Sequence, residues 1–320
     1  MQLVTTAKAV SATHEASADW LRRLFAFAAI YLVWGSTFLA IRDTVATVPP
    51  LMAAGLRVLV AGVLLYAYLR SRGQAAPTRR NWSMAAVSGA LLFVGCHGVL
   101  GWAAQRVPSG ISALLTASIS FWMVLLNSLR RGTMPNRLTW LGLAVGFAGL
   151  LPLMNRGSGS VNVVASVALV LGALSWAVGS LYARGRLVPE APLLAAAMQM
   201  ITGGVFLLLV SSVVGEWGRL DVARVTLRSL VSLSYLIVFG SIVAFGASVW
   251  LLERVPAASV ATYAFVNPIV ALFLGWLFGG EAITVRTVVS TVLIVAAVAM
   301  ITTASARPDP ASAEPAGVKA

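Results

Sequence analysis

Charged residues are scarce in this chain. Asp, Glu, Lys and Arg make up 10% of the 320 residues, whereas apolar types make up 59%. A soluble domain carries roughly 25% charged residues, so this composition cannot cover a water-exposed surface and disfavours a cytosolic enzyme. The single cysteine, Cys96, excludes an intrachain disulfide. A membrane-spanning helix needs about 20 apolar residues, which leaves room for about ten spans.

Carboxylates are also few, and none lies at mid-depth of an apolar segment. The chain has 10 acidic residues, all in expected tails, loops or helix ends. This removes the usual proton or sodium carrier of a coupled transporter and the paired carboxylates of acid–base catalysis. No glycine-rich phosphate loop followed by Lys and Ser or Thr occurs, which disfavours a nucleotide-driven pump. We therefore expect no enzyme, no cofactor and no metal site, since Cys96 and His97 have no third ligand at useful spacing.

Ten apolar segments are present, and the basic residues between them predict their orientation. With the N-terminus inside, the inner segments carry roughly twice as many Lys and Arg residues as the outer ones, which favours two cytoplasmic termini. The net charge of +13 is then explained by basic loops at a membrane surface, and we expect no nucleic-acid partner. The segments are residues 24–41, 51–69, 82–101, 109–129, 138–154, 163–182, 194–214, 230–250, 259–278 and 285–303.

The two halves of the chain repeat each other weakly. At a shift of 142 residues, Trp34 and Arg42 fall on Trp176 and Arg184. A shift of 148 aligns the Gly98–Pro108 region with Gly246–Pro256. Each half holds five spans, an odd number, so the second half enters from the opposite side and the repeat is inverted. We predict an all-α membrane protein with a tail at 1–20, repeats at 21–154 and 155–303, and a disordered tail at 304–320.

Several motifs resemble the EamA type of the drug/metabolite transporter superfamily, most closely its YedA-like branch. They are YLVWGSTF at 31–38, Pro49-Pro50 followed by Arg57, VPSG at 107–110, and YAFVNP at 263–268 with GGE at 279–281. The resemblance implies ten helices in two five-helix repeats, cytoplasmic termini, and export of amino acids or related metabolites. The first half departs from the pattern, with Gly132-Thr133 in place of Gly-Glu and Ser120 in place of Pro268.

Two ionisable groups lie within the expected spans. Arg57 is about two turns into the second span, where it either attracts a substrate carboxylate or is a structural arginine bonded to carbonyls. Its repeat counterpart, Gln199, is also polar. His97 lies toward the outer end of the third span. It either accepts a proton in the neutral range, or bonds a nearby carbonyl or lines an outer vestibule.

Trp34 and Trp176 are repeat-equivalent and near mid-depth. They either wall a pocket for an apolar or aromatic substrate or serve helix packing. We predict that both face one central cavity together with Tyr263 and Asn267.

The ninth span holds the strongest single site candidate. Pro268 removes a helical hydrogen bond and frees a carbonyl. Asn267 lies beside it with a donor and an acceptor, and Tyr263 is one turn away on the same face. Ser118 and Ser241 are further mid-depth candidates, although serines often bond their own helix.

Three features at helix contacts and ends have a structural interpretation. Gly142-x-x-x-Gly146 and Gly275-x-x-x-Gly279 permit close helix contacts, within the chain or in a homodimer. Glu281 precedes the last span and is interpreted as stabilising the start of that helix.

The sequence predicts a multi-pass secondary transporter of a bacterial inner membrane. It would export small metabolites, amino acids or related solutes, by alternating access, with a small-molecule substrate and the lipid bilayer as partners and a monomeric or homodimeric state. The alternative is a flippase for lipids or isoprenoid-linked substrates, which needs a lateral opening to the bilayer. A membrane-embedded enzyme would need a polar catalytic cluster and is less favoured.

Overall fold

The computed structural model describes residues 20–132, 134–154, 162–184, 187–188, 191–255, 257–260 and 262–306, and within these ranges all regular elements are helices. The expected tails lie mostly outside the described residues. Trp20 already belongs to the first helix, and the last helix continues to Ala306, three residues into the expected C-terminal tail.

Helices cover all ten apolar segments. In the described part of the chain, eight helical stretches are long and apolar enough to cross a membrane, and two apolar helices are shorter, Arg137–Leu153 and Tyr263–Gly279. The eight longer stretches are Trp20–Val45, Pro50–Ser71, Arg79–Ala104, Ser109–Arg131, Val163–Ala183, Pro192–Val213, Leu227–Leu252 and Val285–Ala304.

Several of these stretches consist of more than one element. The elements are η1 (Ala29–Val33), α2 (Trp34–Val45), α3 (Pro50–Ser71), α4 (Arg79–Gly89), η2 (Ala90–Gly98), α5 (Val99–Ala104), α6 (Ser109–Thr116), α7 (Ile119–Arg131), α8 (Arg137–Met154), α9 (Val163–Ala183), α10 (Pro192–Val213), η3 (Trp217–Arg219), η4 (Val222–Arg224), α11 (Leu227–Tyr235), η5 (Leu236–Val243), α12 (Ala244–Leu252), α13 (Ala257–Val260), α14 (Tyr263–Gly279) and α15 (Val285–Ala306).

Local sequence explains where the helices begin and end. Pro50 and Pro192 occupy the first turns of α3 and α10, where a missing N–H costs nothing. The Thr226 hydroxyl accepts the Ser229 N–H at the start of α11. Gly132 and Gly280 end α7 and α14 with φ of 65° and 64°, the left-handed conformation that suits glycine.

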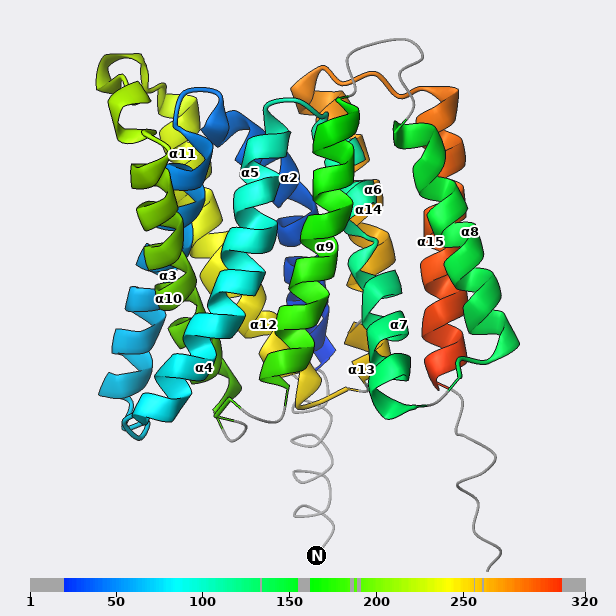
Figure 1. Ribbon diagram of the computed structural model, residues 1–320, viewed down its shortest axis with the longest axis horizontal. Coiled ribbons are helices and arrows are strands. Elements are labelled where there is room, and N and C mark those ends of the chain that lie inside the picture. Colours follow the sequence, from blue (N-terminus) through cyan, green and yellow to red (C-terminus); the bar gives the residue numbers. More distant parts are fainter. Residues whose placement is uncertain are drawn as a thin grey trace, which may run out of the picture.

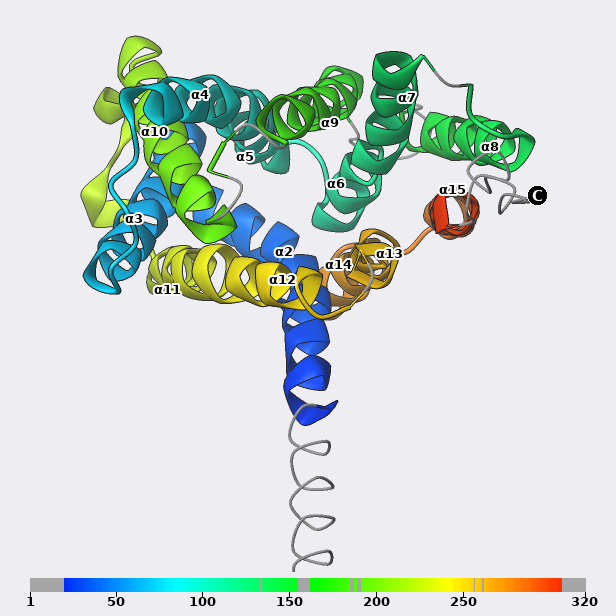
Figure 2. The same cartoon turned by 90° about the horizontal axis from the view of Figure 1, so that it is seen from below.

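The helices run side by side in one bundle (Figure 1), and the first described residues lie at the same end as the end of α15. Helix α3 packs along α10, and α8 packs along α15. Seen along the bundle, α3, α4, α10 and α11 form one side and α8 and α15 the other, with α2, α6, α9, α12 and α14 between them (Figure 2).

Small residues allow the closest helix contacts. A Cβ added to Gly62 of α3 would lie 2.8 Å from the Ile201 nitrogen, and one added to Gly204 of α10 would lie 2.7 Å from the Leu59 nitrogen. Such backbone approach favours van der Waals packing where the hydrophobic effect is weak. The motif glycines do the same within the chain: Gly142 packs on α15, Gly146 on α7, Gly275 on Glu281 and Ser109, and Gly279 on Arg42 and Leu39.

Three π-helical segments interrupt the α-helices. η1 lies in the first span, η2 in the third and η5 in the eighth. The 148-residue shift between the two halves aligns the third span with the eighth. Two of these segments accept hydrogen bonds from a neighbouring helix. Trp34 donates Nε1–H to the carbonyl of Gly240 in η5 at 3.1 Å, and Ser175 donates its hydroxyl to the carbonyl of Leu91 in η2 at 2.8 Å. π-Helical turns are uncommon and concentrate at functional sites.

Candidate substrate cavity

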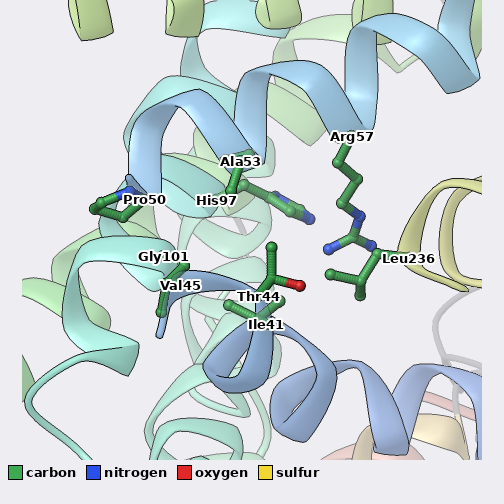
Figure 3. A pocket seen from close by; sticks show the side chains of 10 residues that line it. Ile41, Thr44, Val45, Pro50, Ala53, Arg57, His97, Gly101 and Leu236 are labelled. Carbon is green, nitrogen blue, oxygen red and sulfur yellow. The ribbon is translucent and has the colours of Figure 1, made fainter. Parts of the chain in front are cut away.

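A narrow cavity inside the bundle has a volume of about 20 Å³, room for about one water molecule. Its walls come from α2, α3, the η2–α5 junction and η5 (Figure 3). The lining is mainly apolar, and its charged or polar side chains are Thr44, Arg57 and His97. Small-molecule sites have this character, with few polar groups in an apolar wall. The complete lining is Ile41, Thr44, Val45, Pro50, Ala53, Ala54, Arg57, His97, Gly101 and Leu236.

Arg57 is buried, with 7% of its surface exposed. Its Nε donates to the Ser241 hydroxyl at 3.0 Å, and Ser241 donates in turn to the Leu236 carbonyl at 3.0 Å. The guanidinium projects from α3 toward Thr44 and Leu236 (Figure 3). No carboxylate among the described residues forms an ion pair with Arg57. A buried charge without a partner is unfavourable, so this guanidinium favours an anionic group in the cavity.

His97 lies in η2 and contributes an edge of the same cavity. Its Nδ1 is 3.4 Å from the Leu92 carbonyl, five residues earlier, so Nδ1 is the donor in this contact. The imidazole also packs against Phe93 and Trp176, each with ring centroids 5.2 Å apart. His97 therefore both contacts a nearby carbonyl and forms part of a cavity wall.

Trp34 and Tyr263 lie together outside the cavity that Arg57 lines. Their rings meet edge to face with centroids 4.9 Å apart. Both pack on an apolar cluster that includes Ile30 and Leu251, whereas Trp176 packs on a cluster that includes Val58 and Phe93. Neither tryptophan belongs to the lining of the Arg57 cavity. A single central cavity shared by both tryptophans stays a prediction.

Asn267 is buried between α14 and η1. One terminal atom of its side-chain amide lies 3.1 Å from the Tyr31 carbonyl oxygen and 3.2 Å from the Ile30 carbonyl oxygen. Since a carbonyl can only accept, this atom is the NH2 nitrogen, which donates to both. The amide thereby ties the ninth span to a π-helical turn of the first. In this structure Asn267 acts as a structural link, and its donors are already used.

The serine candidates separate into two kinds. Ser118 is fully buried and donates to the Leu115 carbonyl of its own chain segment at 2.6 Å. Ser241 is not part of the cavity lining, but it holds the Arg57 guanidinium that is.

The cavity was only partly readable from the sequence. Pro50, Ala53, Ala54 and Arg57 follow one face of α3 at helical spacing, and this spacing identifies them as one wall. Thr44 was not predicted, because its hydroxyl donates within its own helix, to Ala40 at 2.7 Å.

A wider hollow adjoins the cavity beside the turn between α2 and α3. It has a volume of about 290 Å³ and shares Val45 and Pro50 with the cavity. Arg106 and Arg219 lie at this hollow, and the Arg106 guanidinium covers the Trp102 ring at 4.4 Å. Glu216 also lines the hollow, so two arginines face one carboxylate there and the remaining positive charge weakly favours anions.

The same fold occurs in a protein of known crystal structure, at a TM-score of 0.62 and 20% identity, covering 89% of this chain and 99% of that one. A model of the EamA-like transporter family matches residues 22–154 and again residues 164–303. The chain belongs to the EamA-like transporter family. This EamA-like transporter is thus a membrane transporter, as the resemblance of its motifs implied.

Relatives of this EamA-like transporter include proteins from several bacteria. The uncharacterized inner membrane transporter YedA of Escherichia coli K12 is 38% identical over 275 residues, which cover 86% of this chain and 88% of YedA. The uncharacterized transporter YvbV of Bacillus subtilis is 27% identical, covering 89% and 92% of the two chains. Protein PecM of Dickeya dadantii is also 27% identical, covering 84% and 88%.

Proposed function

We propose that this EamA-like transporter exports small organic solutes that carry an anionic group, amino acids or related metabolites, and that Arg57 binds this group. The observation that carries the proposal is the buried guanidinium of Arg57 in an apolar cavity, with Ser241 as a side-chain partner and no carboxylate partner among the described residues. An anionic substrate supplies the missing counter-charge, and the cavity, which is narrow in this structure, widens to accept the rest of a small molecule.

The membrane arrangement is part of the proposal. All ten apolar helices cross a bacterial inner membrane, with both termini in the cytoplasm and the two halves inverted. Two separate family matches support the duplication. Repeat-equivalent features support it too: the π-segments η2 and η5, the contact glycines Gly62 and Gly204, and the left-handed ends at Gly132 and Gly280. The basic inner segments and the inner-membrane description of YedA support the location.

Alternating access follows from this symmetry. Arg57 belongs to the first half and Ser241 to the second, so the site lies between the repeats. Rocking of the halves would expose it to one side at a time. The hollow lined by Arg106 and Arg219 is then the outer mouth.

A flippase is the second candidate, because an apolar groove opens on the side of the bundle. It has a volume of about 460 Å³ between η1, α2, α11 and α14. Its rim is exposed, with Leu32 at 59% and Phe273 at 51%. The groove lies beside a close contact of Gly35 with Val270, where an added Cβ would be 2.6 Å from the Val270 Cβ. This contact holds α2 and α14 close together and leaves little room for a lipid to pass between them. We therefore favour a solute over a lipid as the substrate.

Purified protein in liposomes tests the proposal. A panel of radiolabelled amino acids, their amides, which lack the carboxylate, and a fluorescent phospholipid is offered to the wild type and to Arg57→Gln. We expect uptake of at least one acid, none of its amide, and loss of that uptake in the variant. Transport of amides equal to that of acids, or phospholipid movement that exceeds empty liposomes, would contradict the assignment.

A further inference from the structure

A buried carboxylate, Glu281, connects three helices. The end of α2, the start of α6 and the end of α14 meet at the end of the bundle opposite the first described residues and the end of α15 (Figure 1). Glu281, whose side chain is 8% exposed, pairs with Arg42 at the end of α2 at 2.7 Å. It also accepts the N–H groups of Ser109 and Gly110, at 2.6 and 3.1 Å, at the start of α6. Arg42 additionally donates to the Gly279 carbonyl at 3.0 Å. These contacts correct the expectation that Glu281 stabilises its own following helix.

All of these contacts cross from the second half of the chain to the first. Gly279 and Glu281 belong to the second repeat, whereas Arg42, Ser109 and Gly110 belong to the first. Charge-assisted hydrogen bonds of this kind are about twice as strong as neutral ones. If the halves separate at this end, all of these bonds must break together.

The helix held by Glu281 is short. α6 has eight residues and is set off from α7 by a tightened turn, in which the Ser118 and Ser120 N–H groups bond to carbonyls three residues back. Tight turns of this kind often mark hinges within a helix. The half-helix α6 can therefore move without carrying the whole span.

The face of α6 near this contact also carries two buried hydroxyls without a partner. Ser109 and Ser112 are each 1% exposed, and their Oγ atoms form no hydrogen bond. They are three residues apart and so share one face of the helix. Unsatisfied buried hydroxyls are costly and need an explanation. They would gain water as a partner if α6 moved away from α14.

The other end of the bundle lacks the equivalent carboxylate. The 148-residue shift places Thr133 opposite Glu281, and Thr133 lies outside the described residues. Threonine has no charge, so it cannot take the place of Glu281 in an ion pair. The repeat counterpart of Arg42, Arg184, is exposed. The two ends are thus unequal at these aligned positions, where one end has an Arg–Glu pair and the other an Arg and a Thr.

From this inequality we propose that Arg42 and Glu281 form a one-sided latch that holds the outer end closed and makes the inward-open state the resting state. The proposal depends on the proposed function only for which end is outer. An exporter benefits from this bias, because its empty site then faces the cytoplasm, where the substrate is collected. Breaking the latch shifts the population toward the outward-open state.

Cysteine accessibility tests the latch without any substrate. Cys96 is the single cysteine, so Cys96→Ala gives a background without thiols, and Ser112→Cys introduces a reporter of nearly equal size on α6. Full-length protein is labelled in right-side-out and inside-out vesicles with a membrane-impermeant maleimide. We expect Glu281→Gln to raise the outside labelling rate by about fivefold or more.

Glu216→Gln is the matched control. Glu216 is 3% exposed, comes from the second half, and caps the start of α3 by accepting the Leu51 and Met52 N–H groups at 3.2 and 2.8 Å. It joins α3 to the end of α10, helices that pack along each other, so its loss should leave reporter labelling unchanged. Equal acceleration by both variants, or no acceleration by Glu281→Gln, overturns the latch.

A second pair of variants keeps the test decisive if Glu281→Gln does not fold. Arg42→Gln should accelerate labelling in the same direction, and Arg42→Lys should do so less because it retains the charge. Equal labelling of both Arg42 variants and the parent overturns the latch. Acceleration only in inside-out vesicles supports a latch but contradicts the orientation in the proposed function. Failure of solute transport with intact latch behaviour contradicts the substrate assignment alone.

Discussion

Arg57 and Ser241, 184 positions apart in the chain, meet inside the bundle through a 3.0 Å hydrogen bond from Nε to the hydroxyl. The bond joins the second span to the π-helical part of the eighth. The Ser241 hydroxyl in turn donates to the carbonyl of Leu236, five residues earlier. In an α-helix this carbonyl would accept the N–H of the residue four positions later, one before Ser241. The guanidinium is therefore oriented by a feature of η5 as well as by α3.

The first prediction concerns this bond. Ser241→Ala should raise the KM for the anionic solute about tenfold with little change in kcat, since the guanidinium stays but loses its orientation; a hydrogen bond to a charged group contributes about 1.5 kcal/mol or more. Initial uptake rates in liposomes measure both constants. Ser248→Ala is the control, because Ser248 is also buried but donates within its own helix, to Phe245 at 2.7 Å. Equal effects of the two variants would refute the positioning role.

The second prediction concerns proton coupling. His97 and Arg57 line the same cavity, and a protonated imidazole would add a second positive charge to an apolar space, which is unfavourable. We expect solute export to proceed without stimulation by a pH gradient, and His97→Gln to behave in the same way. Transport by wild type and variant is compared with and without the gradient. Strong gradient-driven uptake that persists in the variant would show that another group carries the proton.

The third prediction concerns Asn267. Because its amide faces the carbonyls of Ile30 and Tyr31, Asn267→Ala should leave them without this donor and destabilise the protein by about 1–3 kcal/mol. Asn267→Asp should be worse, since a carboxylate would face carbonyl oxygens. Thermal unfolding in detergent measures both variants. From the sequence Asn267 is instead a candidate substrate contact, and its removal would then reduce transport without reducing the amount of folded protein. Unchanged stability with lost transport would restore the substrate-contact interpretation.

Helix breaks show where sequence reasoning failed. Pro268 was expected to free one helical carbonyl, and α14 runs through it from Tyr263 to Gly279, whereas the ninth span is divided earlier, between α13 and α14. Pro268 lies near the start of α14, so only the carbonyl four residues earlier, in the first turn, loses its donor. The fourth span has no proline and yet is interrupted between α6 and α7, where the Ser118 N–H and hydroxyl both bond the Leu115 carbonyl.

Apolar segments, by contrast, were well predicted, because hydropathy and length are local properties. The face of α3 that ends at Arg57 was also readable from helical spacing. What the sequence could not show is which distant element meets that face. Pairings such as Arg57 with Ser241 and Glu281 with the start of α6 depend on the packing of whole helices, for which a single sequence has no local signal.

The last prediction concerns the contact between α3 and α10. A side chain at Gly62 would place its Cβ 2.8 Å from the Ile201 nitrogen and 2.9 Å from the Ala197 carbonyl oxygen. Backbone atoms cannot move aside as a flexible side chain can, so Gly62→Ala should push the two helices apart and cost about 1–3 kcal/mol. The thermal midpoint and the yield of monodisperse protein should both fall.

Gly246 of α12 provides the control for this substitution. An added Cβ there meets no atom within 4 Å, and alanine favours a helix over glycine by about 1 kcal/mol. Gly246→Ala should therefore leave the thermal midpoint unchanged or raise it slightly. A helix-wide sensitivity to any added methyl group would lower the midpoint for Gly62→Ala and Gly246→Ala alike, and would contradict the close approach of α3 and α10 as the cause.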